Sequence, residues 1–427
     1  MKVLMFGWEF PPHITGGLGT ACFGLTKGLL NNGVDVTFVV PKAYGDESKD
    51  VRLLNASEIS IDVRNKIFKD HWNKLNYIEI DSTLVPYADD EEFYRITRKY
   101  EHHTEVNESV FSENFKFSGK YGSNLMEEVK RYALVATQIA ASKDYDVIHA
   151  HDWLTYEAGI AAKKISGKPL VVHMHATEYD RSGENINQTV FDIEKRGMTE
   201  ADRVIAVSHF TRRIVIEKYG IPAEKVVTVH NAVEPTDKSG VMGISRGVKE
   251  KVVTFLGRIT FQKGPEYFIE AAYKVLQKDK NVRFVMAGSG DMLNRMVRRV
   301  AELKIADRFH FTGFLKGADV DKMFALSDVY VMPSVSEPFG ISPLEAMSSN
   351  VPVVISKQSG VSEVLKYALK VDFWDIDALA DSIYALINYD GISKMFKSMG
   401  KSEVDNLKWD NAAAKVLDVY KQLTMKQ

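Results

Sequence analysis

The stretch MPSVSEPFGISPLEAM, residues 332–347, decides the fold of this chain. It continues an apolar run, Val329 to Met332, which is typical of a strand buried inside a parallel sheet. Pro338 and Gly340 then turn the chain, and a helical segment begins shortly afterwards. A buried strand, a glycine-bearing turn and a new helix predict a ligand site at the carboxyl edge of an open α/β sheet, where free backbone N–H groups attract anions.

Two glutamates flank this turn, and the residues by themselves leave two interpretations open. Ser342 is a suitable N-cap, and Pro343 suits the first helical position. Glu345 stands where a capping box needs an acid, so we expect Ser342 and Glu345 to cap the helix. In the first interpretation Glu345 is only that cap and Glu337 is a solvated loop acid. In the second, both carboxylates hold a ligand.

The bulk properties indicate a globular protein of two domains. With 427 residues, the chain is longer than one ordinary hydrophobic core supports. The formal net charge of -2 leaves no global basic field, so we expect no nucleic-acid partner. One cysteine excludes an internal disulfide framework and suits a reducing compartment. No window reaches the roughly 18 apolar residues of a membrane span, and the first apolar run is too short for a signal peptide. We therefore expect a cytoplasmic protein without integral membrane association, and the sequence carries no signal for its oligomeric state.

The first residues predict the opening of a Rossmann-like domain, with a strand over Val3 to Phe6, a helix over Leu18 to Leu30 and a strand over Val34 to Val40. The loop before the helix ends in Gly16-Gly17, which could let backbone N–H groups approach a phosphate or could be a simple turn. The dinucleotide fingerprint would need a third glycine where Cys22 stands, so we expect no nicotinamide cofactor.

A polar string, His149-Ala150-His151-Asp152-Trp153, ends the strand predicted over Asp146 to Ala150. Alternating strand residues share a face, so His149 and His151 could bind a metal together. No third or fourth ligand follows at a recognisable spacing, and we therefore expect no metal and no cofactor. Asp152 and Trp153 are placed at the active edge of the sheet.

Residues 42–125 are harder to interpret. Short strands are predicted over Val51 to Leu54 and Tyr77 to Ile80. The segment 89–122 is polar with scattered aromatic residues, which could stack on sugar rings or form a small core of their own. We favour the small core.

The second half begins after Asn231 to Lys249, a segment without periodicity and with many turn formers. A new strand, Val252 to Leu256, is followed by Arg258 and Lys263, two cations five residues apart. Fixed cations at this position would stabilise negative charge on a leaving group in a closing cleft. The alternative is that both are solvated surface residues. Further strands alternating with helices predict a second parallel sheet.

Several strings of the chain resemble one enzyme family. EPFGISPLEA, residues 337–346, resembles the Glu–seven–Glu signature of retaining GT-B glycosyltransferases close to glycosyltransferase family 4, and GR at 257–258 followed by KG at 263–264 is a second signature of it. The opening FGWEFPPHITGGLGT, residues 6–20, and HDW, residues 151–153, resemble glycogen and starch synthases. Those synthases usually lack the second Glu, so Glu345 is a departure from their pattern.

The resemblance implies a GT-B fold, which is an α/β fold of two Rossmann-like domains facing across a cleft. It implies an acceptor-side domain over residues 1–235, a linker over 236–250, a nucleotide-sugar-binding domain over 251–405, and a helix over 406–427 that crosses back to the first domain. The implied catalytic residues are Arg258, Lys263, Glu337 and His175. The implied donor-binding residues are Gly16, Gly17, Gly288, Leu315, Phe339, Gly340, Ile341 and Glu345, and the implied acceptor-side residues are Asp152 and Trp153.

The resemblance further implies retaining transfer of glucose from ADP-glucose or UDP-glucose to the end of an α-1,4-glucan. Three alternatives remain at this level. The chain could be another family 4 hexosyltransferase that makes a disaccharide or a cell-surface polysaccharide. It could be a catalytically dead glucan-binding or regulatory protein. It could be a nicotinamide-dependent oxidoreductase, which the missing third glycine disfavours.

Overall fold

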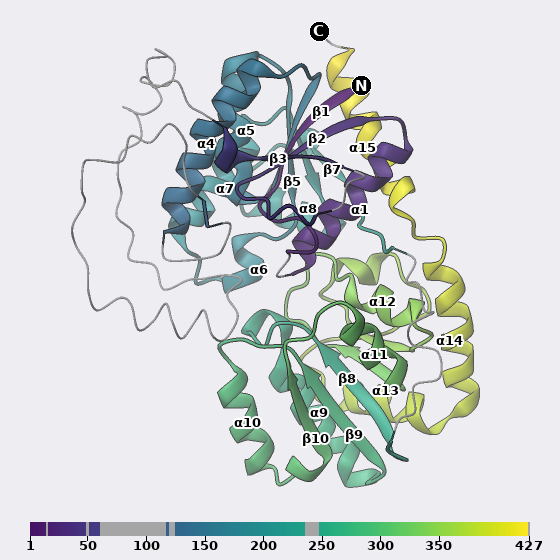
Figure 1. The fold of residues 1–427 in the computed structure, drawn as a ribbon. Coiled ribbons are helices and arrows are strands. Elements are labelled where there is room, and N and C mark those ends of the chain that lie inside the picture. Colours follow the sequence, from purple (N-terminus) through teal and green to yellow (C-terminus); the bar gives the residue numbers. More distant parts are fainter. Residues whose placement is uncertain (14–15, 48–50, 60–116, 119–123, 235–246, 426–427) are drawn as a thin grey trace, which may run out of the picture.

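The computed structural model describes residues 1–13, 16–47, 51–59, 117–118, 124–234 and 247–425 (Figure 1). The predicted strand Tyr77 to Ile80 and most of the aromatic segment 89–122 lie outside these residues.

The first described half is built on a seven-stranded parallel sheet with the order β3-β2-β1-β4-β5-β6-β7. The chain enters at β1 and moves outward through β2 and β3, then returns beside β1 with β4. The order of the strands therefore reverses between β1 and β4, and open α/β sheets bind ligands at such a switch point. The strands are β1 Lys2–Phe6, β2 Asp35–Val40, β3 Arg52–Asn55, β4 Val147–His151, β5 Leu170–Met174, β6 Arg203–Ala206 and β7 Val226–Thr228.

Helices cover both faces of this sheet, because successive strand residues point to opposite sides. Leu4 and Phe6 pack into one core with α4, α5 and α7, whereas Val3 and Met5 pack into another with α1 and the C-terminal helix α15. The helices are α1 Gly17–Asn31, α4 Leu125–Ser142, α5 Trp153–Ser166, α6 Glu178–Ser182, α7 Gln188–Glu200 and α8 His209–Glu217, with short 3-10 turns η1 Ala56–Glu58 and η2 Ala223–Lys225.

The second half repeats this architecture with a six-stranded parallel sheet of order β10-β9-β8-β11-β12-β13. Its order reverses between β8 and β11, so residues 333–347 follow a strand at the switch point. The strands are β8 Lys251–Leu256, β9 Val282–Ala287, β10 Phe309–Gly313, β11 Val329–Met332, β12 Val353–Ser356 and β13 Leu369–Val371.

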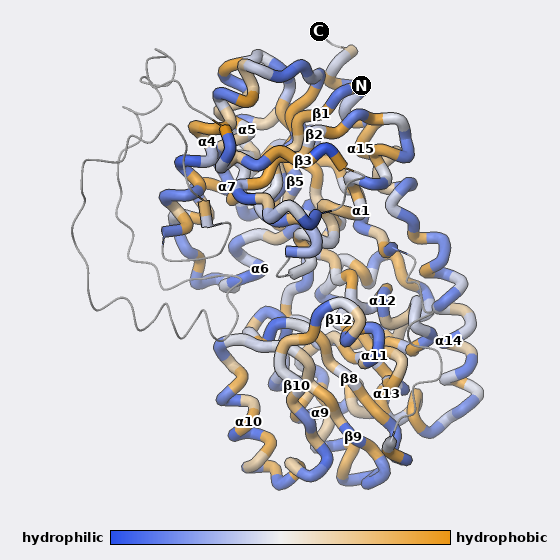
Figure 2. Tube along the Cα trace, viewed as in Figure 1, coloured by the Kyte–Doolittle hydropathy of each residue, from blue (hydrophilic) through white to orange (hydrophobic). Residues whose placement is uncertain are grey.

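Two layers of helices enclose the second sheet. One face packs on α9, α10 and α13 and the other on α11, α12 and α14. Figure 2 shows the strands of both sheets mainly as hydrophobic and the outer helices as mixed, which is the pattern of sheets buried on both faces. The helices are α9 Pro265–Lys278, α10 Leu293–Glu302, α11 Ala318–Leu326, α12 Ser342–Ser348, α13 Ile376–Asn388 and α14 Asp390–Val404, with 3-10 turns η3 Phe261–Lys263, η4 Ala306–Arg308 and η5 Gly360–Glu363.

The last helix, α15 (Trp409–Thr424), leaves the second half and packs on α1 of the first (Figure 1). Two glycines of α1 make room for it. A Cβ at Gly24 would lie 2.3 Å from the Trp409 ring, and one at Gly28 would lie 2.7 Å from the Trp409 carbonyl oxygen. The predicted return of the C-terminal helix to the first domain is confirmed.

The predicted capping box at the start of α12 is wrong. The helix begins at Ser342 itself, Ile341 occupies the N-cap position, and the cap has no side-chain hydrogen bond. Ile341 already has helical backbone angles, with φ -79° and ψ -34°. Because an N-cap side chain bonds the helix from extended backbone, Ser342 comes one residue too late for that role.

The predicted linker, residues 236–250, lies between β7 and β8 and so between the two sheets. Most of it is outside the described residues, and the domain bounds themselves stay predictions.

Candidate active site

The carboxyl edges of the two sheets meet at the loop that follows β11. The Ser336 hydroxyl donates to Asp180 Oδ1 of the first half at 2.5 Å. The Ser208 hydroxyl, at the start of α8, donates to the Pro338 carbonyl oxygen at 2.6 Å. The EPFG turn, residues 337–340, therefore contacts the first half directly, and the residues that end strands in both halves border one interface.

An ion pair crosses the switch point of the second sheet. Lys263 Nζ lies 2.5 Å from Glu337 Oε2, which also accepts a hydrogen bond from Ser334 Oγ at 3.2 Å. Both side chains are largely shielded from water, with exposed fractions of 20% for Lys263 and 8% for Glu337. The structure thus brings together two residues that are 74 positions apart and that the sequence analysis assigned to one site.

Backbone packing holds this pair in place. The Val335 N–H donates to the Gln262 carbonyl oxygen at 2.9 Å, which ties the turn carrying Lys263 to the loop carrying Glu337. Gly264 has φ +63°, and a Cβ there would lie 2.2 Å from the Pro333 carbonyl oxygen. Only glycine satisfies both requirements, so the KG signature has a structural reason beside the cation.

Arg258 follows β8 and donates through Nη2 to the buried Gln262 Oε1 at 2.8 Å. The loop after β9 packs closely against the backbone on both sides of Arg258. A Cβ at Gly288 would lie 1.8 Å from the Gly257 carbonyl oxygen, and one at Gly290 would lie 2.5 Å from that of Ile259. Gly288 therefore permits close packing, and its donor-binding role stays a prediction.

The remaining residues predicted to bind the donor differ in accessibility. Phe339 is 2% exposed, so its donor-binding role stays a prediction. Gly340 has φ +98° beside Glu337, and Leu315 and Ile341 are half-buried. Glu345 is half-buried on α12, where burial and the nearby Asp321 raise its pKa to about 7.

In the first half, Gly16 and Gly17 begin α1. Gly16 is the N-cap, and a Cβ at Gly17 would meet no heavy atom within 4 Å among the described residues. The first backbone N–H groups of a helix have no partner inside the helix and attract anions. One of these groups, the Gly19 N–H, already donates to the buried Glu9 Oε1 at 3.3 Å, so the approach of a diphosphate to Gly16 and Gly17 stays a prediction.

Asp152 orders the loop that carries His175. It lies between β4 and α5 with φ 59°, and its Oδ1 accepts from the N–H of His175 at 2.8 Å and of Ala176 at 3.4 Å. Burial raises the pKa of Asp152 to about 6, against the opposing charge of Arg181 and these two hydrogen bonds. Asp152 and Trp153 are each 2% exposed, so their predicted acceptor-side role stays a prediction, and the observed role of Asp152 is to position the loop.

Four histidines stack on one face of the first sheet. In the parallel register His151 stands opposite His173, so the His-x-His strings at 149–151 and 173–175 lie side by side. The ring centroids are 4.3 Å apart for His149 and His151, and 4.4 Å apart for His173 and His175. Burial lowers the pKa of all four, that of His175 to about 3, so the rings are neutral at pH 7.

Partners from distant parts of the chain reach this histidine stack, His149, His151, His173 and His175. His149 Nδ1 lies 2.5 Å from the hydroxyl of Tyr420 on α15, and Cys22 of α1 lies beside His151 and His175. Sequence patterns did not predict these neighbours, because they come from the two helices that cover this face. The repeated His-x-His ending of two adjacent strands was the available signal.

A buried acidic cluster lies next to His175. Arg181 of α6 forms ion pairs with Glu178 and with Glu194 of α7. Thr177 is the N-cap of α6 and forms a capping box with Asp180. Burial raises the pKa of Glu194 to about 7, although Arg181 and the Tyr219 hydroxyl favour its charged form. Sequence patterns did not predict this cluster, since its members pair across two helices.

A second contact joins the two halves. Glu363 of η5 accepts from the His209 and Phe210 N–H groups of α8 at 2.9 and 2.7 Å, and lies 2.7 Å from His230 Nε2. Burial alone would raise the pKa of Glu363, but these hydrogen bonds together lower it.

Two family models match the chain, one for each half. Residues 87–237 match "Glycosyltransferase Family 4", and residues 244–403 match "Glycosyl transferases group 1". An uncharacterized glycosyltransferase of Methanocaldococcus jannaschii is 29% identical over 439 residues, covering 99% of this chain and 98% of that protein. A glycogen synthase of Mycobacterium tuberculosis is 23% identical over 370 residues, covering 86% of this chain and 80% of that protein.

Solved structures share the fold over the whole chain. A sucrose-phosphate synthase of Thermosynechococcus elongatus has a TM-score of 0.70 at 18% identity, with all of both chains covered. HepE of Anabaena in complex with UDP and glucose has a TM-score of 0.66 at 19% identity, covering 99% of this chain and 100% of that one. In the part of the chain that the structure describes, no helix is both long and apolar enough to span a membrane.

Proposed function

Because the chain belongs to the glycosyltransferases of the GT-B fold and is of the family 4 type, we propose that it transfers glucose from a nucleotide-glucose to the end of an α-1,4-glucan with retention. The observation that carries this proposal is the Lys263–Glu337 pair at the switch point of the second sheet, with Arg258 on the neighbouring strand end. A cation pair beside an acid at this edge suits a sugar diphosphate.

The cations would act on the leaving group. Breaking the bond between the anomeric carbon and the diphosphate oxygen leaves negative charge on the diphosphate. Arg258 and Lys263 would stabilise this charge, which is larger in the transition state than in the ground state. No metal ion is needed in this step, because two fixed side-chain charges take its place.

Glu337 would have two roles. Before the donor binds it holds Lys263 in position through the 2.5 Å contact. With the donor bound, its carboxylate would orient the sugar hydroxyls and offset cationic character at the anomeric carbon. When Glu337 gives up its contact with Lys263 and binds the sugar hydroxyls, the Lys263 ammonium stays near the site and can bind the phosphate.

Retention follows from attack on the same face from which the diphosphate departs. The acceptor oxygen forms the new bond to the anomeric carbon, the carbon–oxygen bond to the diphosphate breaks, and a phosphate oxygen takes the acceptor proton. His175 would lie under the donor sugar, where its neutral imidazole can accept or donate a hydrogen bond. Glu345 would bind the ribose, and Gly16 and Gly17 would approach the diphosphate.

The glucan acceptor is the most specific part of the proposed function. It is supported by the FGWEFPPHITGGLGT and HDW strings and by the likeness to a glycogen synthase. The likeness to HepE, whose structure holds UDP and glucose, supports a nucleotide-glucose donor. The likeness to a sucrose-phosphate synthase favours the second candidate, transfer to a small sugar acceptor.

One assay separates these functions. The protein is incubated with radiolabelled ADP-glucose or UDP-glucose and a panel of glucans, monosaccharides and sugar phosphates. We expect label in the glucans, released by an enzyme that cleaves α-1,4 linkages. Label in a disaccharide would replace the glucan acceptor with a small one. Absence of both transfer and donor hydrolysis would support a catalytically dead glucan-binding or regulatory protein.

A further inference from the structure

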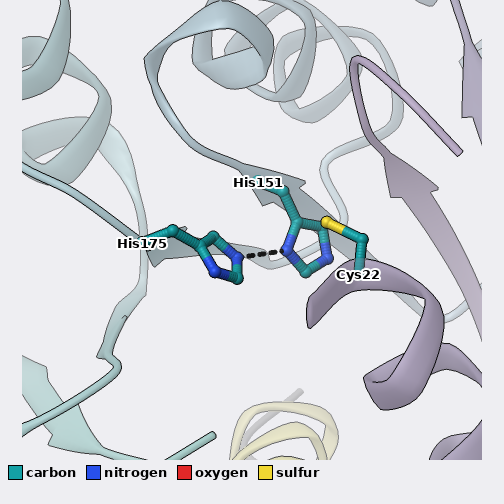
Figure 3. A group of neighbouring side chains, drawn as sticks. All are labelled: Cys22, His151 and His175. Carbon is teal, nitrogen blue, oxygen red and sulfur yellow. Dashed lines mark hydrogen bonds between the residues drawn. The ribbon is translucent and has the colours of Figure 1, made fainter. Parts of the chain in front are cut away.

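Cys22, His151 and His175 form a cluster at the switch point of the first sheet (Figure 3). Cys22 comes from α1, His151 ends β4, and His175 follows β5. One donor atom of each residue lies within 4.8 Å of the other two, and His151 Nδ1 lies 2.9 Å from His175 Nε2. One thiol and two imidazoles are thus held together by three elements.

The cluster has donor capacity that the protein leaves unused. Cys22 is 1% exposed and His151 is 0% exposed. His151 Nε2 has no hydrogen-bond partner among the described residues. Buried polar atoms are almost always satisfied, and leaving one unpaired costs about 1–3 kcal/mol. An ion held by Nε2 would recover this free energy, whereas an ion held by Nδ1, the nitrogen that contacts His175, would not.

The donor set selects the kind of ion. One sulfur and two imidazole nitrogens are ligands of zinc and of ions with similar preferences, whereas magnesium and calcium prefer oxygen. In a tetrahedral zinc site neighbouring donor atoms are about 3.3–3.6 Å apart. The 2.9 Å contact between the two rings would therefore open by a few tenths of an ångström, which small side-chain rotations allow.

Neighbouring groups of possible ligands fit less well. His149, His151 and His173 also bring donor atoms within 4.8 Å, but their rings are stacked with interplanar angles of 28°, 4° and 24°. A metal lies in the plane of each imidazole that binds it, so rings stacked face to face cannot share one ion. The rings of His151 and His175 are tilted by 34° and meet through their nitrogens. His230 in a third group is already paired with Glu363.

We propose that Cys22, His151 and His175 bind a zinc-class divalent ion, with water in the fourth position, and that this ion inhibits the enzyme. On binding, the Cys22 thiol releases its proton to solvent, while both imidazoles bind in the neutral form. His175 is only partly buried and offers the way in. The inhibition rests on the proposed place of His175 under the donor sugar; the binding of the ion does not.

Cobalt titration of the metal-stripped full chain tests the site. Cobalt bound to a thiolate absorbs in the near ultraviolet, and Cys22 is the single cysteine of the 427 residues, so this band reports on one place only. We expect the band to saturate at one ion per chain, to disappear on addition of zinc and to be absent in Cys22→Ser. A wild-type protein without the band would overturn the proposal.

Two variants control for folding and for other sites. Cys22→Ala repeats the test without a hydroxyl, and thermal unfolding shows whether either variant has lost its structure. His13→Ala removes a ligand from the exposed group His13, Asp46 and Glu47, and should leave the band unchanged. Loss of the band in His13→Ala with a normal unfolding temperature would contradict the assignment of His151 and His175 as the other two ligands.

Transfer assays test the inhibition separately. Zinc should lower the turnover of the metal-stripped wild type at least tenfold, a chelator should restore it, and Cys22→Ser should be far less sensitive. Equal inhibition of Cys22→Ser, or a saturated cobalt band with unchanged turnover, would overturn the inhibitory role. If the chain shows no transfer activity, the proposed function fails, and the absorption band still decides whether the ion binds.

Discussion

The two halves of the chain reach their shared interface through the same topology and with different side chains. At the switch point of the second sheet stand Arg258 and Lys263, two basic side chains on loops that glycines allow to pack closely. At that of the first sheet stand His151 and His175, whose pKa burial lowers, so both are neutral at pH 7.

In the proposed function, this difference divides one reaction between two kinds of surface. Charge that develops on a diphosphate would be met by the cations of the second half. A sugar would be met by neutral groups of the first half, which hydrogen-bond without adding charge. Substitutions in the two halves are expected to have effects that range from several kcal/mol to about 1 kcal/mol.

The largest effect is expected from removing the cations of the second half. Lys263→Ala and Arg258→Ala should each lower kcat by about 10²–10³-fold, because each takes a fixed charge away from the leaving diphosphate. Initial rates at saturating donor measure this. Lys322→Ala, which removes an exposed lysine of α11 paired with Asp319, is the matched control and should leave kcat unchanged. Near-normal turnover in both test variants would refute the assigned role.

Close backbone packing at the carboxyl edge of the second sheet predicts the next largest effect, a loss of stability. Gly264→Ala should lower the free energy of unfolding by about 2–4 kcal/mol, because its Cβ would meet the Pro333 carbonyl oxygen in addition to the strain of a positive φ. Gly313→Ala is the control, since Gly313 has φ +74° but no described atom within 4 Å of its Cβ, and should lower it by about 1 kcal/mol. Equal losses in urea unfolding would mean that the close approach is unimportant.

Glu345 links stability with pH in the second half. Its pKa is raised from 4.5 to about 7, so between these values the folded protein holds a proton that the unfolded chain has released, and the free energy of unfolding falls as the pH rises. Glu345→Gln should therefore be more stable than the wild type at about pH 8 by roughly 1–3 kcal/mol, less so at lower pH, while its KM for the donor rises.

Urea unfolding at several pH values and donor saturation curves measure these two effects. Glu302→Gln, at an exposed acid of α10, is the control and should show neither. A stability difference that does not depend on pH would contradict the assigned burial of the Glu345 charge.

The smallest effect concerns the contact between the halves. Glu363→Gln keeps only one of the two oxygens that accept from the α8 N–H groups and removes the charge that pairs with His230, so it should lower the free energy of unfolding by about 1 kcal/mol. Because the pKa of Glu363 is lowered in the fold, this contribution is present above the ordinary value of 4.5 and is lost as the pH falls through the folded value. The free energy of unfolding of variant and wild type is measured in parallel over a pH series. A difference that persists in acid would show that the charge of Glu363 is not its cause.

Local patterns predicted most of the architecture correctly. The apolar runs at Val3 to Phe6 and Val329 to Met332 are buried parallel strands, and the expected placement of Arg258, Lys263 and Glu337 at one sheet edge agrees with the structure. The expected cap at Ser342 failed, since the backbone before it is already helical. Such a difference of one residue depends on how the EPFG turn packs, which no local pattern contains.

The sequence by itself determined which residue types end each strand and therefore which chemistry reaches the interface, because strand periodicity and turn residues are local properties. Only the tertiary structure decided which of these groups touch. Lys263 meets Glu337 because β8 and β11 are neighbours, and Cys22 meets His151 because α1 covers the face to which the histidines point. Contacts of this kind depend on packing between elements far apart in the chain, and packing is settled only when the whole domain is assembled.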